Sequence, residues 1–139
     1  MKAFFDTSAL VKRYVEEGGS DEVKELLQKT TELGLSLLVV PECISSFSRL
    51  RRSHQLTSKQ YHQIKEDFLT DIIDVSLCGI TQKSVQRALH LLESYPLKTL
   101  DALHIASALE WQAEYFISAD VQQIKVAKSN KLKVITIYA

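Results

Sequence analysis

The chain has 139 residues, enough to bury the core of one ordinary domain and too few for two, so we expect a single domain over residues 1–139. Its hydrophobic fraction of 45% and charged fraction of 24%, with 4 Gly and 2 Pro, are typical of a folded protein and argue against disorder. The formal net charge is +0, so attraction for nucleic acid has to come from a local patch or a bound cation.

The start of the chain and its cysteines indicate a cytoplasmic protein. The first residues, MKAFFD, contain one basic residue and a very short apolar stretch, unlike a signal peptide or a membrane anchor. The longest apolar stretch, residues 35–40, is far shorter than a membrane span. Cys43 and Cys78 lie far apart and lack the spacing of a zinc site or a disulfide framework, so we interpret them as reduced thiols.

Strand-like apolar runs alternate with segments of helical periodicity along the chain. The predicted strands cover residues 3–5, 36–40, 72–75, 115–118 and 133–137. The predicted helices cover residues 8–16, 21–33, 41–53, 57–69, 81–94, 99–112 and 121–130, with Ser20 or Asp21 as the N-cap of the second. Apolar strands joined by helices predict a mostly parallel sheet of about five strands covered on both faces, a three-layer α/β/α sandwich.

Four acidic residues fall where predicted strands end or helices begin. Asp6 follows the first strand, Glu42 follows the second after one proline, and Asp120 lies just past the fourth. Asp101 opens the helix over residues 99–112. Each acid alone can be explained as a helix cap or as a partner of a helix dipole. The carboxyl edge of a parallel sheet is a ligand-binding edge, however, so four acids converging there indicate a site.

Carboxylates held close together raise one another's pKa, so such a site calls for a compensating cation. Ligation by oxygen alone favours Mg²⁺ or Mn²⁺ over zinc, and Mg²⁺ keeps several of its waters. A hard cation with available water suits in-line hydrolysis of a phosphodiester bond. The acids therefore predict a metal-dependent hydrolase.

The same residues resemble the PIN-domain family, especially the VapC-type toxins of bacterial and archaeal toxin–antitoxin pairs. The resemblance covers nearly the whole chain and is carried by FFDTSALVKRY at residues 4–14, PECISSFSRL at 41–50, LKTLDALHIASAL at 97–109 and YFISAD at 115–120. It implies a PIN-like fold and a Mg²⁺- or Mn²⁺-dependent endoribonuclease. The resemblance also implies the catalytic and metal-binding set Asp6, Glu42, Asp101 and Asp120.

Several residues near the four acids could support the site, although each also has an ordinary structural explanation. Thr7 or Ser8 resembles the family's hydroxyl that holds the first acid, although a helix N-cap explains either equally well. His104 stands three residues after Asp101, but the family does not use this histidine as a ligand, so we expect a structural role. A cluster of basic residues follows Glu42 and consists of Arg49, Arg51, Arg52 and His54. This cluster could bind RNA phosphates or complement a helix dipole.

By resemblance, the expected partners are an RNA substrate, a second copy of the chain in a homodimer, and an antitoxin whose tail covers the acidic crevice. A free-standing PIN nuclease that processes RNA and a non-catalytic PIN-like binding module remain open as alternatives. A phosphatase of the haloacid dehalogenase type is disfavoured, because it needs a second Asp where Ser8 stands.

Overall fold

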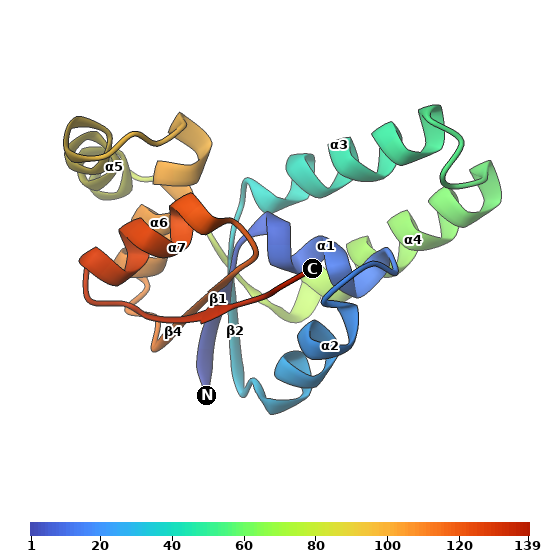
Figure 1. Ribbon diagram of the computed structural model, residues 1–139, viewed down its shortest axis with the longest axis horizontal. Helices are drawn as coiled ribbons and strands as arrows, with labels where there is room; N and C mark the ends of the chain where they lie inside the picture. Colours follow the sequence, from blue (N-terminus) through green and yellow to red (C-terminus); the bar gives the residue numbers. More distant parts are fainter.

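A computed structural model describes all residues, 1–139, as five β-strands, seven α-helices and one short 3₁₀ helix (Figure 1). The strands are β1 (Lys2–Phe5), β2 (Glu32–Ser36), β3 (Ser76–Cys78), β4 (Tyr115–Ser118) and β5 (Lys133–Thr136). The helices are α1 (Thr7–Tyr14), α2 (Ser20–Lys29), α3 (Val39–Arg52), α4 (Ser58–Asp71), η1 (Ile72–Asp74), α5 (Gln82–Ser94), α6 (Thr99–Glu110) and α7 (Val121–Ser129).

The five strands form one parallel sheet in the order β3-β2-β1-β4-β5, which confirms the predicted α/β fold. The chain starts at the central strand, proceeds outward through β2 and β3, and then returns to pair β4 with the other side of β1. Strand order therefore reverses between β1 and β4. In open parallel sheets this reversal opens a crevice at the carboxyl ends of the two strands.

The core lies in two layers because successive side chains of a strand point to opposite faces of the sheet. On β1, Ala3 and Phe5 belong to a buried cluster shared with α1, α2, α3 and α4. Phe4, between them, belongs to the opposite cluster, which α5, α6 and α7 complete. Side chains of β4 also point to opposite faces, so Ile117 belongs to the first cluster and Phe116 to the second. The chain thus has helices on both faces of the sheet, as predicted.

Two predicted strands are displaced in the structure. The second was predicted at residues 36–40, but β2 ends at Ser36, and the following β-branched residues Val39 and Val40 begin α3. Pro41 is tolerated there because the amides of a first helical turn need no helical partner. The third was predicted at residues 72–75, where the structure has the 3₁₀ helix η1 and places β3 afterwards.

The N-cap predicted for the second helix was also wrong. Neither Ser20 nor Asp21 caps α2; the cap is Gly19, with a left-handed φ of 92°. A β-carbon at Gly19 would lie 2.6 Å from the Ile137 side chain, so the C-terminal segment packs where only glycine fits. The predicted free thiols are present, with Cys43 buried and Cys78 partly buried.

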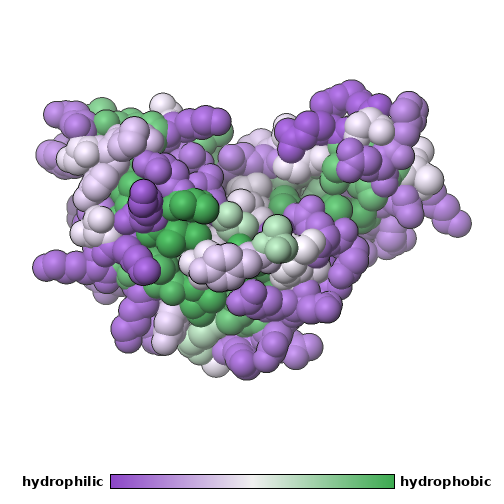
Figure 2. Space-filling view, viewed as in Figure 1, coloured by the Kyte–Doolittle hydropathy of each residue, from purple (hydrophilic) through white to green (hydrophobic).

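Helices α3 and α4 form an arm that extends away from the sheet, at the right of Figure 1. The arm is held near the sheet by an aromatic cluster in which Phe47 and Phe68 meet edge-on at 5.8 Å and Tyr14 contacts both. Figure 2 shows the surface hollowed between this arm and the side that carries α5 and α6. None of the helices combines the length and apolar character needed to cross a membrane.

Candidate active site

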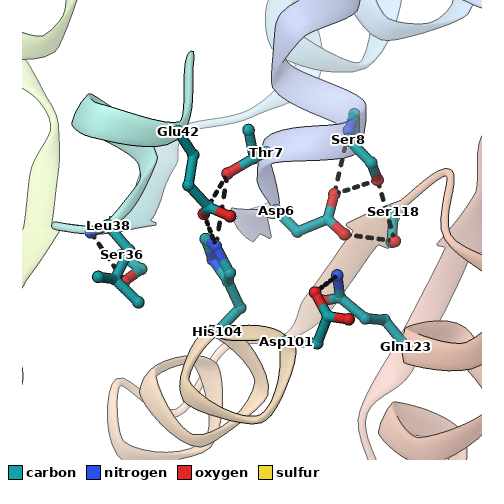
Figure 3. Close-up of polar contacts among 11 residues, drawn as sticks. Asp6, Thr7, Ser8, Ser36, Leu38, Glu42, Asp101, His104, Ser118 and Gln123 are labelled. Atoms are coloured by element: carbon teal, nitrogen blue, oxygen red, sulfur yellow. Dashed lines mark hydrogen bonds and ion pairs between the residues drawn. The ribbon is translucent and has the colours of Figure 1, made fainter. Parts of the chain in front are cut away.

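Asp6 occupies the end of β1 at the point where strand order reverses. Its side chain is fully buried and caps α1 by accepting a hydrogen bond from the Ala9 amide at 3.0 Å. The same oxygen, Oδ1, accepts from Ser8 Oγ at 2.7 Å, and Oδ2 accepts from Ser118 Oγ at 2.5 Å (Figure 3). Burial raises the pKa of the Asp6 carboxyl, and the bonds from Ser118 and Ser8 offset part of this rise.

The two serines also join β1 to the segment after β4. Ser118 Oγ accepts from the Asp120 amide at 2.9 Å, and Ser8 Oγ accepts from the Ala119 amide at 3.0 Å. Each hydroxyl therefore accepts a hydrogen bond from the segment that follows β4 and donates one to Asp6. Of the two hydroxyls predicted beside the first acid, Ser8 contacts it, whereas the Thr7 side chain points to Glu42.

Glu42 lies in the first turn of α3 rather than directly after a strand. Its Oε1 accepts from Thr7 Oγ1 at 2.8 Å and is also hydrogen-bonded to His104 Nε2. Burial opposes ionisation of this carboxyl, but the hydrogen bond and charge of His104, together with the Thr7 bond, outweigh it and lower the pKa of Glu42. Glu42 is thus an ionised carboxylate fixed at one oxygen.

Asp101 and Asp120 lie at the starts of α6 and α7, on the other side of Asp6. Asp120 caps α7, and its Oδ1 accepts from the amides of Gln122 and Gln123 at 2.9 and 3.1 Å. Asp101 Oδ1 accepts from Gln123 Nε2 at 3.0 Å. Burial raises the pKa of Asp101, and the nearby carboxylate of Asp120 raises it further. Gln123 therefore contacts both acids of a mutually repelling pair.

The structure brings all four predicted acids to the carboxyl edge of the sheet, with a protein partner at one oxygen or both. As they stand, no group of three or more His, Cys, Asp or Glu side chains is arranged to hold a metal ion. The chemistry of the donors nevertheless fits a hard cation. Glu42 Oε2, Asp101 Oδ2 and Asp120 Oδ2 have no hydrogen-bond partner within the protein and are oxygen ligands of the kind Mg²⁺ and Mn²⁺ prefer.

Three residues of this site were missed or only partly recognised in the sequence. Ser118 was expected as the end of a strand, and Gln123 was not singled out. His104, buried as expected, contacts Glu42 as well as packing on α6. Its three-residue spacing from Asp101 was the one available signal. The predicted RNA-contacting residues Arg49, Arg51 and Arg52 lie away from the acids, toward the outer end of α3.

The fold and the site together define the class of this protein: an α/β protein with a cluster of carboxylates at the carboxyl edge of its parallel sheet. Comparison with known proteins identifies the family. The PIN domain family matches residues 3–136, so this chain belongs to the PIN domain family, as the sequence motifs predicted. Two relatives from Mycobacterium tuberculosis, Ribonuclease VapC45 and Ribonuclease VapC49, are each 32% identical over 109 residues, covering 76% of this chain and 74% of theirs.

Solved structures agree on the fold. A toxin–antitoxin complex from Klebsiella pneumoniae has a TM-score of 0.73 at 23% identity, with 98% of both chains covered. FitAcB from Neisseria gonorrhoeae has a TM-score of 0.75 at 13% identity and 96% coverage of both chains. VapC20 from Mycobacterium tuberculosis, a Sarcin-Ricin loop cleaving toxin, has a TM-score of 0.66 at 16% identity, covering 88% of this chain and 93% of its own.

Proposed function

We propose that this chain is a Mg²⁺- or Mn²⁺-dependent endoribonuclease, the toxin of a toxin–antitoxin pair, acting as one domain over residues 1–139. The observation that carries the proposal is the set of carboxylates at the carboxyl edge of the sheet, of which Glu42, Asp101 and Asp120 each keep an oxygen free of protein partners. The names of the relatives, ribonucleases and toxins, favour RNA as the substrate and a toxin over a free-standing processing nuclease.

The cation would be held, directly or through water, by Asp6, Glu42, Asp101 and Asp120. When bound, it neutralises phosphate charge and lets water act as a nucleophile near neutral pH. The protein's own contribution is to orient the carboxylates. The hydroxyls of Ser118 and Ser8 fix Asp6, and each of the other acids has one oxygen held by a hydrogen bond. Without a cation the acids repel RNA phosphates, so cation binding and substrate binding favour each other.

The outer part of the arm, from Cys43 to Lys65, supplies positive charge that the acidic edge lacks. Between Cys43 and Lys65 the sequence has five Lys or Arg residues and no Asp or Glu, and none of the five forms a salt bridge. Figure 2 shows hydrophilic side chains gathered at the outer end of this arm. Arg52 lies about 15 Å along the α3 axis from Glu42. The arm therefore suits contacts with phosphates beyond the cleaved bond.

Two protein partners belong to the proposal. The antitoxin is supported by the toxin–antitoxin complexes among the structural relatives. The homodimer is supported by exposed apolar side chains on and before α5, because Ile80, Val85 and Leu89 are 45%, 42% and 52% exposed. Light scattering should give twice the chain mass, and Leu89→Lys should give a monomer. A monomeric wild-type protein at micromolar concentration would remove the dimer from the proposal.

The nuclease proposal is tested with purified protein and single-stranded RNA. Cleavage should require Mg²⁺ or Mn²⁺, stop with EDTA, leave a 5′-phosphate and persist when the 2′-hydroxyl next to the scissile bond is blocked, because water is the nucleophile. Asp101→Asn should remove most activity, whereas Glu66→Gln, an exposed acid on α4, should leave it unchanged. Cleavage that resists EDTA, or full activity in Asp101→Asn, would contradict the assignment.

The role of the arm is tested separately by replacing Arg49 and Arg52 with Ala, two exposed residues outside the acidic edge. RNA affinity should fall, and the slope of log K against log salt should flatten by about 0.7 for each phosphate that the arm no longer neutralises. The cleavage rate at saturating RNA should change little. An unaltered salt slope would show that the arm does not contact the substrate.

A further inference from the structure

His104 makes a specific contact that the packing of α6 does not require. The residue is 1% exposed and its Nε2 is hydrogen-bonded to Glu42 Oε1, with Thr7 Oγ1 at 3.4 Å. Thr7 donates to the same Glu42 oxygen at 2.8 Å. Side chains from α1, α3 and α6 thus meet at a single carboxylate oxygen (Figure 3).

The direction of the histidine hydrogen bond follows from its partner. An ionised carboxylate accepts hydrogen bonds and donates none, so His104 Nε2 carries the hydrogen. The other ring nitrogen, Nδ1, is buried and has no partner. A buried polar atom without a partner destabilises the fold, and an apolar side chain of similar volume would avoid that cost. The contact of Nε2 with Glu42, supplemented by the longer one with Thr7, offsets it.

The position of the Glu42 carboxylate depends on this contact. Glu42 has a flexible side chain that is 26% exposed, and fixing such a side chain costs conformational entropy. Thr7 and His104 both hold Oε1, whereas Oε2 has no protein partner. Figure 3 shows this second oxygen turned toward the side of the site where Asp6 lies. The anchoring therefore orients the carboxylate and leaves one oxygen available to a ligand.

We propose that His104 is a positioning residue that holds Glu42 in the orientation needed to bind the cation, before any cation arrives. The inference rests on the proposed function, in which Glu42 is one of the cation-binding acids. Partners that orient a ligating carboxylate contribute to metal affinity, and their loss typically weakens binding by about 10- to 100-fold. His104 acts through Glu42 and does not touch the substrate.

The test compares Mn²⁺ dissociation constants, measured by isothermal titration calorimetry, for three variants of α6. His104→Leu should weaken binding by about tenfold or more. His104→Gln, whose amide can donate from nearly the position of Nε2, should recover most of that affinity. Ser107→Ala is the matched control, because Ser107 is also buried on α6 and its hydroxyl has no partner, so Mn²⁺ affinity should not change. Unchanged affinity in His104→Leu, or equally weak binding in the Gln and Leu variants, would overturn the proposal.

Two further measurements keep the proposal testable on its own. Thr7→Val removes the other donor to the same oxygen and should also weaken Mn²⁺ binding, which covers the case in which His104→Leu does not fold. In the metal-free protein, ¹⁵N NMR should show a protonated His104 Nε2 whose proton is lost to rapid exchange in Glu42→Ala. If wild type binds no Mn²⁺, the proposed function fails, and the NMR result still decides whether His104 holds Glu42. An unprotonated Nε2 would refute the contact itself.

Discussion

Replacing Asp6 with Asn should leave the stability of the metal-free protein equal or close to that of wild type. The same change should remove the stabilisation by Mn²⁺. Burial raises the pKa of Asp6 in the folded state, so ionising this group costs stability. The cost is absent below the pKa of the unfolded chain, grows as pH rises through the folded pKa, and is fully present above it. Asn has no charge to bury and avoids this cost at neutral pH.

The contacts of Asp6 set the size of the effect. Asn keeps an oxygen for the Ala9 amide and Ser8, and caps a helix about as well as Asp. It mismatches one bond, to the Ser118 hydroxyl, at a cost of about 1 kcal/mol that the removed charge offsets. Asp6→Ala instead loses the cap and leaves two hydroxyls without acceptors, about 3–5 kcal/mol in total. For a chain of this size that lowers Tm by about 10–20 °C.

Scanning calorimetry at pH 7.5, with and without Mn²⁺, separates these effects. At 100 times its dissociation constant, the ion should stabilise wild type by about 2.7 kcal/mol, and Asp6→Asn should show little of this gain. The exposed-acid variant Glu66→Gln should respond like wild type. An equal Mn²⁺ response in wild type and Asp6→Asn would contradict the metal assignment, and a metal-free Asp6→Asn as unstable as Asp6→Ala would refute the argument from burial.

Two more predictions concern Asp101 at the acidic edge and Gly34 in the middle of β2. Because burial and then Asp120 raise the folded pKa of Asp101, wild type should lose stability relative to Asp101→Asn as pH rises from about 4 to 7 without metal, and a pH-independent difference in Tm would count against this. Gly34→Ala places a β-carbon 2.7 Å from the Trp111 ring and should cost about 1–3 kcal/mol in urea unfolding. Trp111→Phe, which removes the contacted ring atoms, should recover part of that stability, and full additivity of the two changes would argue against the clash.

The sequence predicted the fold class and the four acids because both depend on local pattern. An apolar run followed by an acid, as at Asp6, marks the end of a buried strand without knowledge of the rest of the chain. The same logic failed for the second strand, because apolar periodicity continues through LSLLVV across the break between β2 and α3. Val39 and Val40 favour strands intrinsically, but tertiary packing places them in a helix.

The contacts that orient the acids could not be predicted in the same way. Ser118 donates to Asp6 across 112 residues of sequence, and His104 meets Glu42 across 62. Such pairs depend on which strands are neighbours in the sheet, and a single sequence does not specify strand order. Gln123 is a further example: it is a buried residue of α7, and nothing in its local sequence indicates the contact with Asp101.

The position of β4 also determines when the site can form during protein synthesis. In a nascent chain that has reached Glu114, the central strand β1 can pair only with β2, because β4 has not yet been made. In that chain Asp6 has no Ser118 to fix its second oxygen, and Asp120 has not yet been added. A ribosome must therefore translate past Ser118 and Asp120 before the proposed nuclease site can form, which delays any RNA cleavage by this site until β4 has been made.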